Sequence, residues 1–206
     1  MIEPSPGRSI DEALALPDSL TITTVQPVAN WRTLSSTGRL AWPDTCTDPA
    51  EVSNLGVEAY RWMAKELVAR GRATSVQGLI WGWYRLPGWM SWRFDLPTCP
   101  SDEEVVLTLR VPRERVLLSW FEPWDDVLCG GAVPAMLEDW ECDADLPPSQ
   151  LRATWTRIFH DGEIYEAGYG NRNTLGIQAV LPYLRISDVV NARVGVKVFH
   201  INKHDV

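Results

Sequence analysis

Runs of β-branched and apolar residues recur through this chain, and few helical patterns separate those in its second half. We expect strands over residues 21–28, 79–86, 104–112, 115–121, 177–186 and 192–202. We expect helices over residues 29–40, 50–70, 123–129 and 150–159. Parallel strands need crossover helices, and this order of elements offers too few of them. The sequence therefore predicts an α+β fold rather than a doubly wound α/β fold.

Glycine and proline residues mark several boundaries of these elements. Gly38 follows the first helix and is a typical helix stop. Gly82 lies inside a strand, which indicates a bulge or a close approach of two backbones. Pro182 places its strand at a sheet edge or at a bulge, and Ser149 is a candidate N-cap for the helix that follows it.

The length and the termini suggest one domain. Residues 1–19 contain prolines, acidic residues and one short apolar patch, so we expect a flexible or loosely docked lead-in. Residues 20–206 would then form a single α+β domain. No apolar run is long enough to span a membrane, and the N-terminus lacks the pattern of a secretory signal. We therefore expect a cytoplasmic protein without a membrane partner.

Acidic residues are concentrated in one segment of the chain. Residues 101–150 hold 12 acidic and 3 basic side chains, although the net charge of the whole chain is only −8. A face this negative repels the phosphates of nucleic acids. A solvated acidic surface is the simplest explanation. The alternative is that this segment, with its tryptophans, forms a docking surface for a protein partner.

Eleven tryptophans are the other unusual feature, and four of them crowd into a short stretch: Trp81, Trp83, Trp89 and Trp92. Tryptophans bury large areas, so core packing explains most of them. The alternative is a stacking surface for a base, a nicotinamide or a sugar.

Sequence motifs of several enzyme classes are absent. The chain has no phosphate-binding loop, no dinucleotide-binding glycine pattern and no serine-hydrolase elbow. Its four cysteines include no Cys-x-x-Cys pair, and its three histidines lack a converging helical spacing. We therefore expect no metal site.

A family resemblance extends over nearly the whole folded part of the chain. Six blocks carry it, in this order: TTVQPVANWRTLSSTGRL, AYRWMAKELVARG, IWGWYR, VVLTLRVPRERVLLSWFEPWDDVL, WTRIF and IQAVLPYLRISDVV. Together, from about residue 21 to residue 199, they resemble the bacterial domain-of-unknown-function family 3841. This resemblance implies no particular activity.

A more distant resemblance concerns ADP-ribosyltransferases. These enzymes begin with a strand that carries a Tyr-His-x-Thr-like motif, and they end with a strand in which a Glu precedes an apolar pair. On this pattern Thr24 falls at the His, Gln26 at the Thr and Gln178 at the Glu. The aromatic position of the second strand is Trp83 or Tyr84. The resemblance implies split mixed or antiparallel sheets with flanking helices.

The same resemblance implies an NAD-dependent transferase that acts on protein or nucleic acid. Gln178 and Thr24 would be the catalytic positions, and the remaining residues would bind NAD as co-substrate: Gln26, Trp83, Tyr84, Arg85 and Arg93. The two arginines would face the pyrophosphate, and residues 87–104 would close over the ligand. We expect Thr24 and Gln178 to lie side by side in a nucleotide-sized crevice.

Two departures from the ADP-ribosyltransferase pattern leave the function open. An amide at position 178 can hydrogen-bond a ribose hydroxyl, but it carries no charge to stabilise a cationic transition state. Glu163 or Glu166, in a preceding loop, could supply that charge. The alternative is a non-catalytic ligand- or protein-binding module on the same scaffold, which takes a nucleotide-type small molecule or a protein partner.

Overall fold

The structure of the protein is a computed structural model that describes residues 8–41, 54–76, 78–88, 104–136 and 146–194. Its strands are β1 (Ser19–Pro27), β2 (Arg39–Leu40), β3 (Ile80–Arg85), β4 (Glu104–Pro112), β5 (Leu117–Trp120), β6 (Ile177–Leu181), β7 (Leu184–Arg185) and β8 (Val189–Val194). Its α-helices are α1 (Ile10–Ala13), α2 (Val28–Thr37), α3 (Asn54–Ala69), α5 (Phe121–Leu128), α7 (Pro148–Thr154) and α8 (Glu163–Glu166). Its 3-10 helices include η1 (Arg113–Arg115), η3 (Trp155–Phe159) and η4 (Ile186–Asp188).

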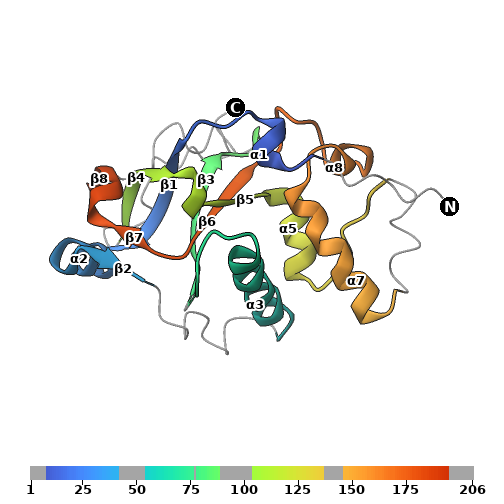
Figure 1. Ribbon diagram of the computed structural model, residues 1–206, viewed down its shortest axis with the longest axis horizontal. Helices are drawn as coiled ribbons and strands as arrows, with labels where there is room; N and C mark the ends of the chain where they lie inside the picture. Colours follow the sequence, from blue (N-terminus) through green and yellow to red (C-terminus); the bar gives the residue numbers. More distant parts are fainter. Residues whose placement is uncertain (1–7, 42–53, 77, 89–103, 137–145, 195–206) are drawn as a thin grey trace, which may run out of the picture.

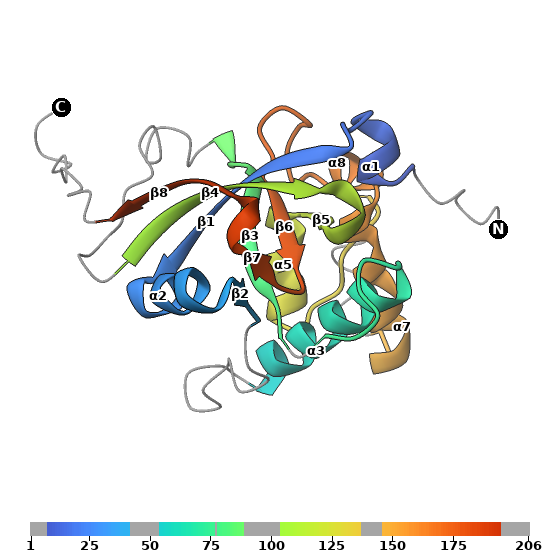
Figure 2. The same cartoon turned by 60° about the vertical axis from the view of Figure 1, so that its left-hand side comes forward.

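The strands form one six-stranded sheet and one two-stranded sheet. The larger sheet has the order β5-β6-β3-β1-β4-β8, and β2 pairs with β7 in the smaller one. Every strand pair is antiparallel. Helix α2 lies at the β8 end of the molecule, whereas α7 and α8 lie at the β5 end (Figures 1 and 2). The predicted α+β class, with antiparallel sheets and flanking helices, is confirmed.

The register of the strands defines two faces of the large sheet. Directly paired residues of antiparallel strands point to the same face, and successive residues of one strand point to opposite faces. Gly82 pairs with Ala179, which pairs with Leu118, and we call the side of the sheet to which these residues point the first face. Trp81 pairs with Val180, and the side to which these two residues point is the second face.

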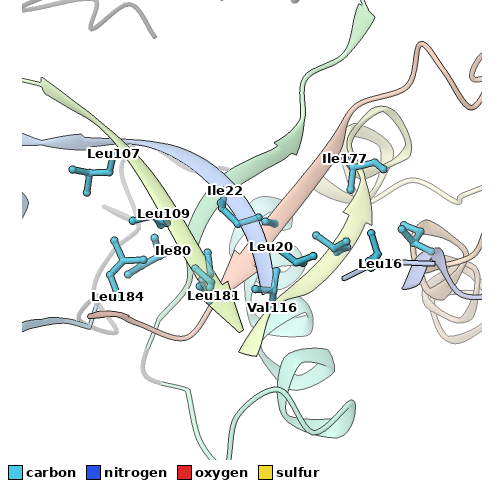
Figure 3. Close-up of a cluster of buried hydrophobic side chains, with 14 of the residues drawn as sticks. Leu16, Leu20, Ile22, Ile80, Leu107, Leu109, Val116, Ile177, Leu181 and Leu184 are labelled. Atoms are coloured by element: carbon cyan, nitrogen blue, oxygen red, sulfur yellow. The ribbon is translucent and has the colours of Figure 1, made fainter. Parts of the chain in front are cut away.

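A hydrophobic core covers the first face (Figure 3). Alternate residues of β1 and β4 supply its centre, because Leu20, Ile22, Leu107 and Leu109 are buried on the same side of their strands. Leu34 of α2 closes this core from outside the sheet. The periodicity of the strand sequences thus determines which side chains meet here.

A second core lies on the opposite face and is rich in aromatic rings. Tyr60 of α3 makes edge contacts with Trp81 and Trp124, at ring-centroid distances of 5.6 and 5.9 Å. Trp155 packs against α3 in the same core. Trp124 here and Trp120 in the first core, both from the acidic segment, are thus buried inside the domain.

Gly82 lies where β1 and β3 approach closely, as its place in the strand suggested. A Cβ atom at this position would lie 2.7 Å from Cγ2 of Ile22 and 2.9 Å from the carbonyl oxygen of Thr23. Distances this short leave no room for a side chain. Glycine is therefore required for the central strands to pair.

Several predicted boundaries differ from the structure. Ser149 lies inside α7, whose N-cap is Pro147, because proline suits the first turn of a helix without a side-chain cap. The strand expected over 177–186 ends at Leu181, and the chain turns at Pro182 before β7. The last strand begins at Val189, earlier than predicted, and the predicted residues beyond 194 lie outside the described part.

From residue 8 onward, the predicted lead-in packs against the domain. Ile10 and Leu16 are buried in the first core, and Ser9 forms a β-bridge with His160. Asp11 forms an ion pair with Arg72. Within the described part of the chain, no helix combines the length and apolar character that a membrane span requires.

Candidate functional site

A chain of three buried or half-buried polar side chains occupies the end of β1. The hydroxyl of Thr24 donates to the carbonyl of Trp81 at 2.6 Å and accepts from Nε2 of Gln26 at 2.9 Å. Nδ2 of Asn30, on α2, donates to Oε1 of Gln26 at 3.1 Å. Thr24 and Gln26 are only 1% and 5% exposed. Buried polar groups need hydrogen-bond partners, and these bonds supply them for Thr24 and Gln26. The two side chains therefore have a structural role without any ligand.

Gln178 has a different set of neighbours. It lies in the middle of β6 and is 4% exposed, and its Nε2 donates to Oγ of Ser119 on β5 at 2.9 Å. Its direct partner on the other side is Trp83 of β3. The ring of Trp83 meets the ring of Phe121 edge-on, at a centroid distance of 4.8 Å.

Thr24 and Gln178 point to opposite faces of the sheet. Thr23 pairs directly with Trp83, and Trp83 pairs directly with Gln178, so these three side chains share the second face. Thr24 is the next residue after Thr23 and points to the first face. The expectation that Thr24 and Gln178 lie side by side in one crevice is therefore wrong.

The remaining predicted cofactor residues are divided in the same way. Tyr84 follows Trp83 directly in β3 and packs against the first core, so the two neighbouring aromatics point to opposite faces of the sheet. The first face thus carries Thr24, Gln26 and Tyr84, and the second carries Trp83 with Gln178. Position 93 and most of the predicted closing loop lie outside the described residues.

Arg85 braces a loop. Its guanidinium donates to the carbonyl oxygens of Leu175, at 3.1 Å, and Arg172, at 2.5 Å. It also lies 5.4 Å from the ring centroid of Trp120. Burial lowers the pKa of Arg85 from its ordinary value. These contacts account for a structural role between β3 and the segment that precedes β6.

Of the two acids proposed to replace the missing charge, only Glu166 has a described side chain. Glu166 is exposed at the end of α8, and only the backbone of Glu163 is described. The carboxylate nearest in sequence to Ser119 is Glu122, which accepts the backbone N–H of Gly176 at 2.9 Å. Burial raises the pKa of Glu122 above its ordinary value.

One row of paired residues crosses all six strands on the second face. In the spatial order of the strands, its members are Ser119, Gln178, Trp83, Thr23, Thr108 and Asn191. We call this set the polar row. Every member except the indole carries a hydroxyl or an amide, and none is charged. Exposure rises along the row, from buried at Ser119 and Gln178 to exposed at Asn191.

One comparison with known proteins gives a match. A family model described as Domain of unknown function (DUF3841) matches residues 21–165, more than half of the 206 residues. The chain belongs to this family. No curated protein and no solved structure matches it.

The match to the DUF3841 family includes part of the polar row. Thr23, Trp83, Thr108 and Ser119 lie inside the matched residues, whereas Gln178 and Asn191 follow them. Sequence reasoning on this family member found Trp83 and Gln178 but missed the other four. Alternation within each strand signals which residues share a face, but the row also depends on which strands are neighbours.

Proposed function

We propose that this DUF3841 domain is a non-catalytic binding module for a small molecule, and that its ligand lies over the polar row. The observation that carries the proposal is the unbroken run of uncharged hydrogen-bonding groups across six paired strands. On a covered face of a sheet, such a row of paired residues is normally apolar. On the second face, the apolar side chains of the second core end at Trp81 and Val180, and the next residues on that face are Trp83 and Gln178 of the row.

The chemistry of the row suggests the class of ligand. Hydroxyl and amide groups both donate and accept hydrogen bonds, so they suit a neutral ligand with groups of both kinds. The indole of Trp83 is half-buried and offers a surface on which a ring can stack. A nucleobase, a nicotinamide or a sugar ring combines these properties.

The absence of charge in the row favours binding over catalysis. Cleavage of NAD develops positive charge on the ribose, and a fixed carboxylate is the group that stabilises it. Gln178 lacks that charge, and Thr24 points to the other face of the sheet. The transferase hypothesis stays a prediction, which NAD turnover tests directly.

Thermal unfolding of the full chain with NAD, ADP-ribose, nicotinamide or glucose at millimolar concentration tests the proposal. A ligand that binds the native state raises the melting temperature, and saturation to about 100 times Kd adds about 2.7 kcal/mol of stability. We expect at least one of these ligands to raise it. Gln178→Ala and Asn191→Ala should reduce that shift.

Gln26→Ala is the matched control, because Gln26 is as buried as Gln178 but points to the opposite face. It should lose stability and keep the ligand-dependent shift. Equal ligand-dependent shifts in the melting temperatures of Gln178→Ala and Gln26→Ala would show that the polar row is not the binding site. Release of nicotinamide from NAD by the wild-type chain, lost in Gln178→Ala, would favour the transferase instead.

A further inference from the structure

Three arginines surround the ring of Tyr183, in the turn between β6 and β7. The guanidinium carbons of Arg39, Arg115 and Arg185 lie 4.2, 4.9 and 5.2 Å from the ring centroid. Nη2 of Arg185 also donates to the Tyr183 hydroxyl at 3.1 Å. Three positive charges are thus collected around one aromatic ring, in a chain whose net charge is −8.

Two of these arginines are direct cross-strand partners. Arg39 of β2 pairs with Arg185 of β7 in the two-stranded sheet, and both side chains are exposed. Like charges directly opposite each other on paired strands are destabilising. Contact with Tyr183 offsets part of this repulsion, because a cation over an aromatic face is attracted to it.

The third arginine is buried and incompletely paired. The side chain of Arg115 is 8% exposed, and its Nη2 lies 2.6 Å from Oδ2 of Asp188. The same carboxylate oxygen accepts the backbone N–H of Arg185 at 2.8 Å. Nε of Arg115 is buried without a hydrogen-bond partner. A buried guanidinium donor without a partner is costly unless a ligand supplies the acceptor.

We infer that Arg39, Arg115 and Arg185 form a binding site for a phosphate group around Tyr183. Three guanidinium groups and the single carboxylate of Asp188 leave a formal charge of +2. That charge matches the dianion of inorganic phosphate or of a phosphate monoester. Arginine suits this role because its planar fork of donors matches the oxygens of phosphate.

The ionisation of Tyr183 is consistent with an unbalanced positive field. Burial raises the pKa of its hydroxyl, but the Arg115 and Arg185 guanidinium groups outweigh burial, so the pKa lies below its ordinary value. A bound phosphate would neutralise these groups. It should therefore raise the pKa of Tyr183, which absorbance titration of the wild type against Tyr183→Phe can follow.

Calorimetric titration of the full chain with inorganic phosphate and with 5′-AMP, at constant ionic strength, tests the inference. We expect phosphate to bind and Arg39→Gln and Arg185→Gln each to weaken its affinity at least tenfold. Both side chains are exposed, so these variants should fold. Binding of 5′-AMP without inorganic phosphate, weakened by Arg39→Gln and unchanged by Gln178→Ala, would identify a monoester as the ligand.

Arg61→Gln is the charge-matched control, because Arg61 is an exposed arginine of α3. It should keep the affinity of the wild type, and Gln178→Ala should keep it as well, which separates this site from the polar row. The inference is overturned if neither phosphate compound binds. It is also overturned if Arg39→Gln and Arg185→Gln bind as tightly as Arg61→Gln.

Discussion

The hydroxyl of Thr24 both donates to a backbone carbonyl of β3 and accepts from Gln26. It thereby joins two neighbouring strands at a point where their close approach allows only glycine, at Gly82. The whole side chain is buried, so water cannot replace either bond. Thr24 therefore adds polar contacts between strands to the apolar packing at the middle of the sheet.

Thr24→Val should destabilise the protein by about 1–3 kcal/mol, because it removes the donor and leaves Nε2 of Gln26 without its acceptor. Urea unfolding measures the loss. Thr21→Val is the control, since Thr21 lies on the same strand with an exposed side chain, and it should change stability by less than about 0.5 kcal/mol. Equal effects of the two substitutions would contradict the role given to Thr24.

At the scale of one element, α5 gathers three carboxyl groups: Glu122 and Asp126, which are half-buried, and Asp125, which is exposed. Burial is the main cause that raises the pKa of each. The hydroxyl of Tyr169 donates to Asp126, which opposes the effect of burial at that residue. The carboxyl groups of this short helix are thus more easily protonated in the folded chain than in the unfolded one.

The sign of the resulting pH dependence follows from Glu122. Because its folded pKa is raised above 4.5, the folded state binds a proton more tightly than the unfolded state. Its favourable contribution is complete below pH 4.5 and is lost as pH rises through the folded pKa. Glu122→Gln should therefore flatten the fall in stability above pH 4.5, measured by urea unfolding at several pH values.

Glu114→Gln removes the same charge from an exposed position on η1. This control should keep the pH dependence of the wild type. A Glu122→Gln profile that runs parallel to the wild-type profile at every pH would contradict the prediction.

On the scale of the whole molecule, the segment before β1 ties distant elements together. Ile10 fills the first core at 1% exposure. The carboxylate of Asp11 meets Arg72, beyond α3, and Arg113 of η1. The guanidinium of Arg172 donates to the carbonyl of Ala13. These contacts link parts of the chain that are far apart in sequence.

Ile10→Ala should lower the free energy of unfolding by about 2–5 kcal/mol, because it leaves a cavity between α1 and the large sheet. Thermal or urea unfolding measures the loss. Val190→Ala, at a position that is 62% exposed on β8, should cost far less. If Ile10→Ala is as mild as Val190→Ala, the segment contributes little to the core.

The sequence determined the type of most elements and which residues within one strand share a face. The alternation in β1 and β4 identifies the buried side chains of the first core because the period of a strand is two residues. β2 was not predicted, and β7 was expected only as the end of one longer strand, since two-residue strands carry no periodic signal. The arginine cluster that depends on their pairing was missed for the same reason.

Only the tertiary structure decided which strands are neighbours and in what register. Pairing of β3 with both β1 and β6 puts Thr23, not Thr24, on the face of Gln178. A shift of one residue moves a side chain to the other face, and residues more than 150 positions apart leave no local trace of their register. The polar row and the Tyr183 site both arise from such long-range pairings, because they depend on contacts that no sequence window contains.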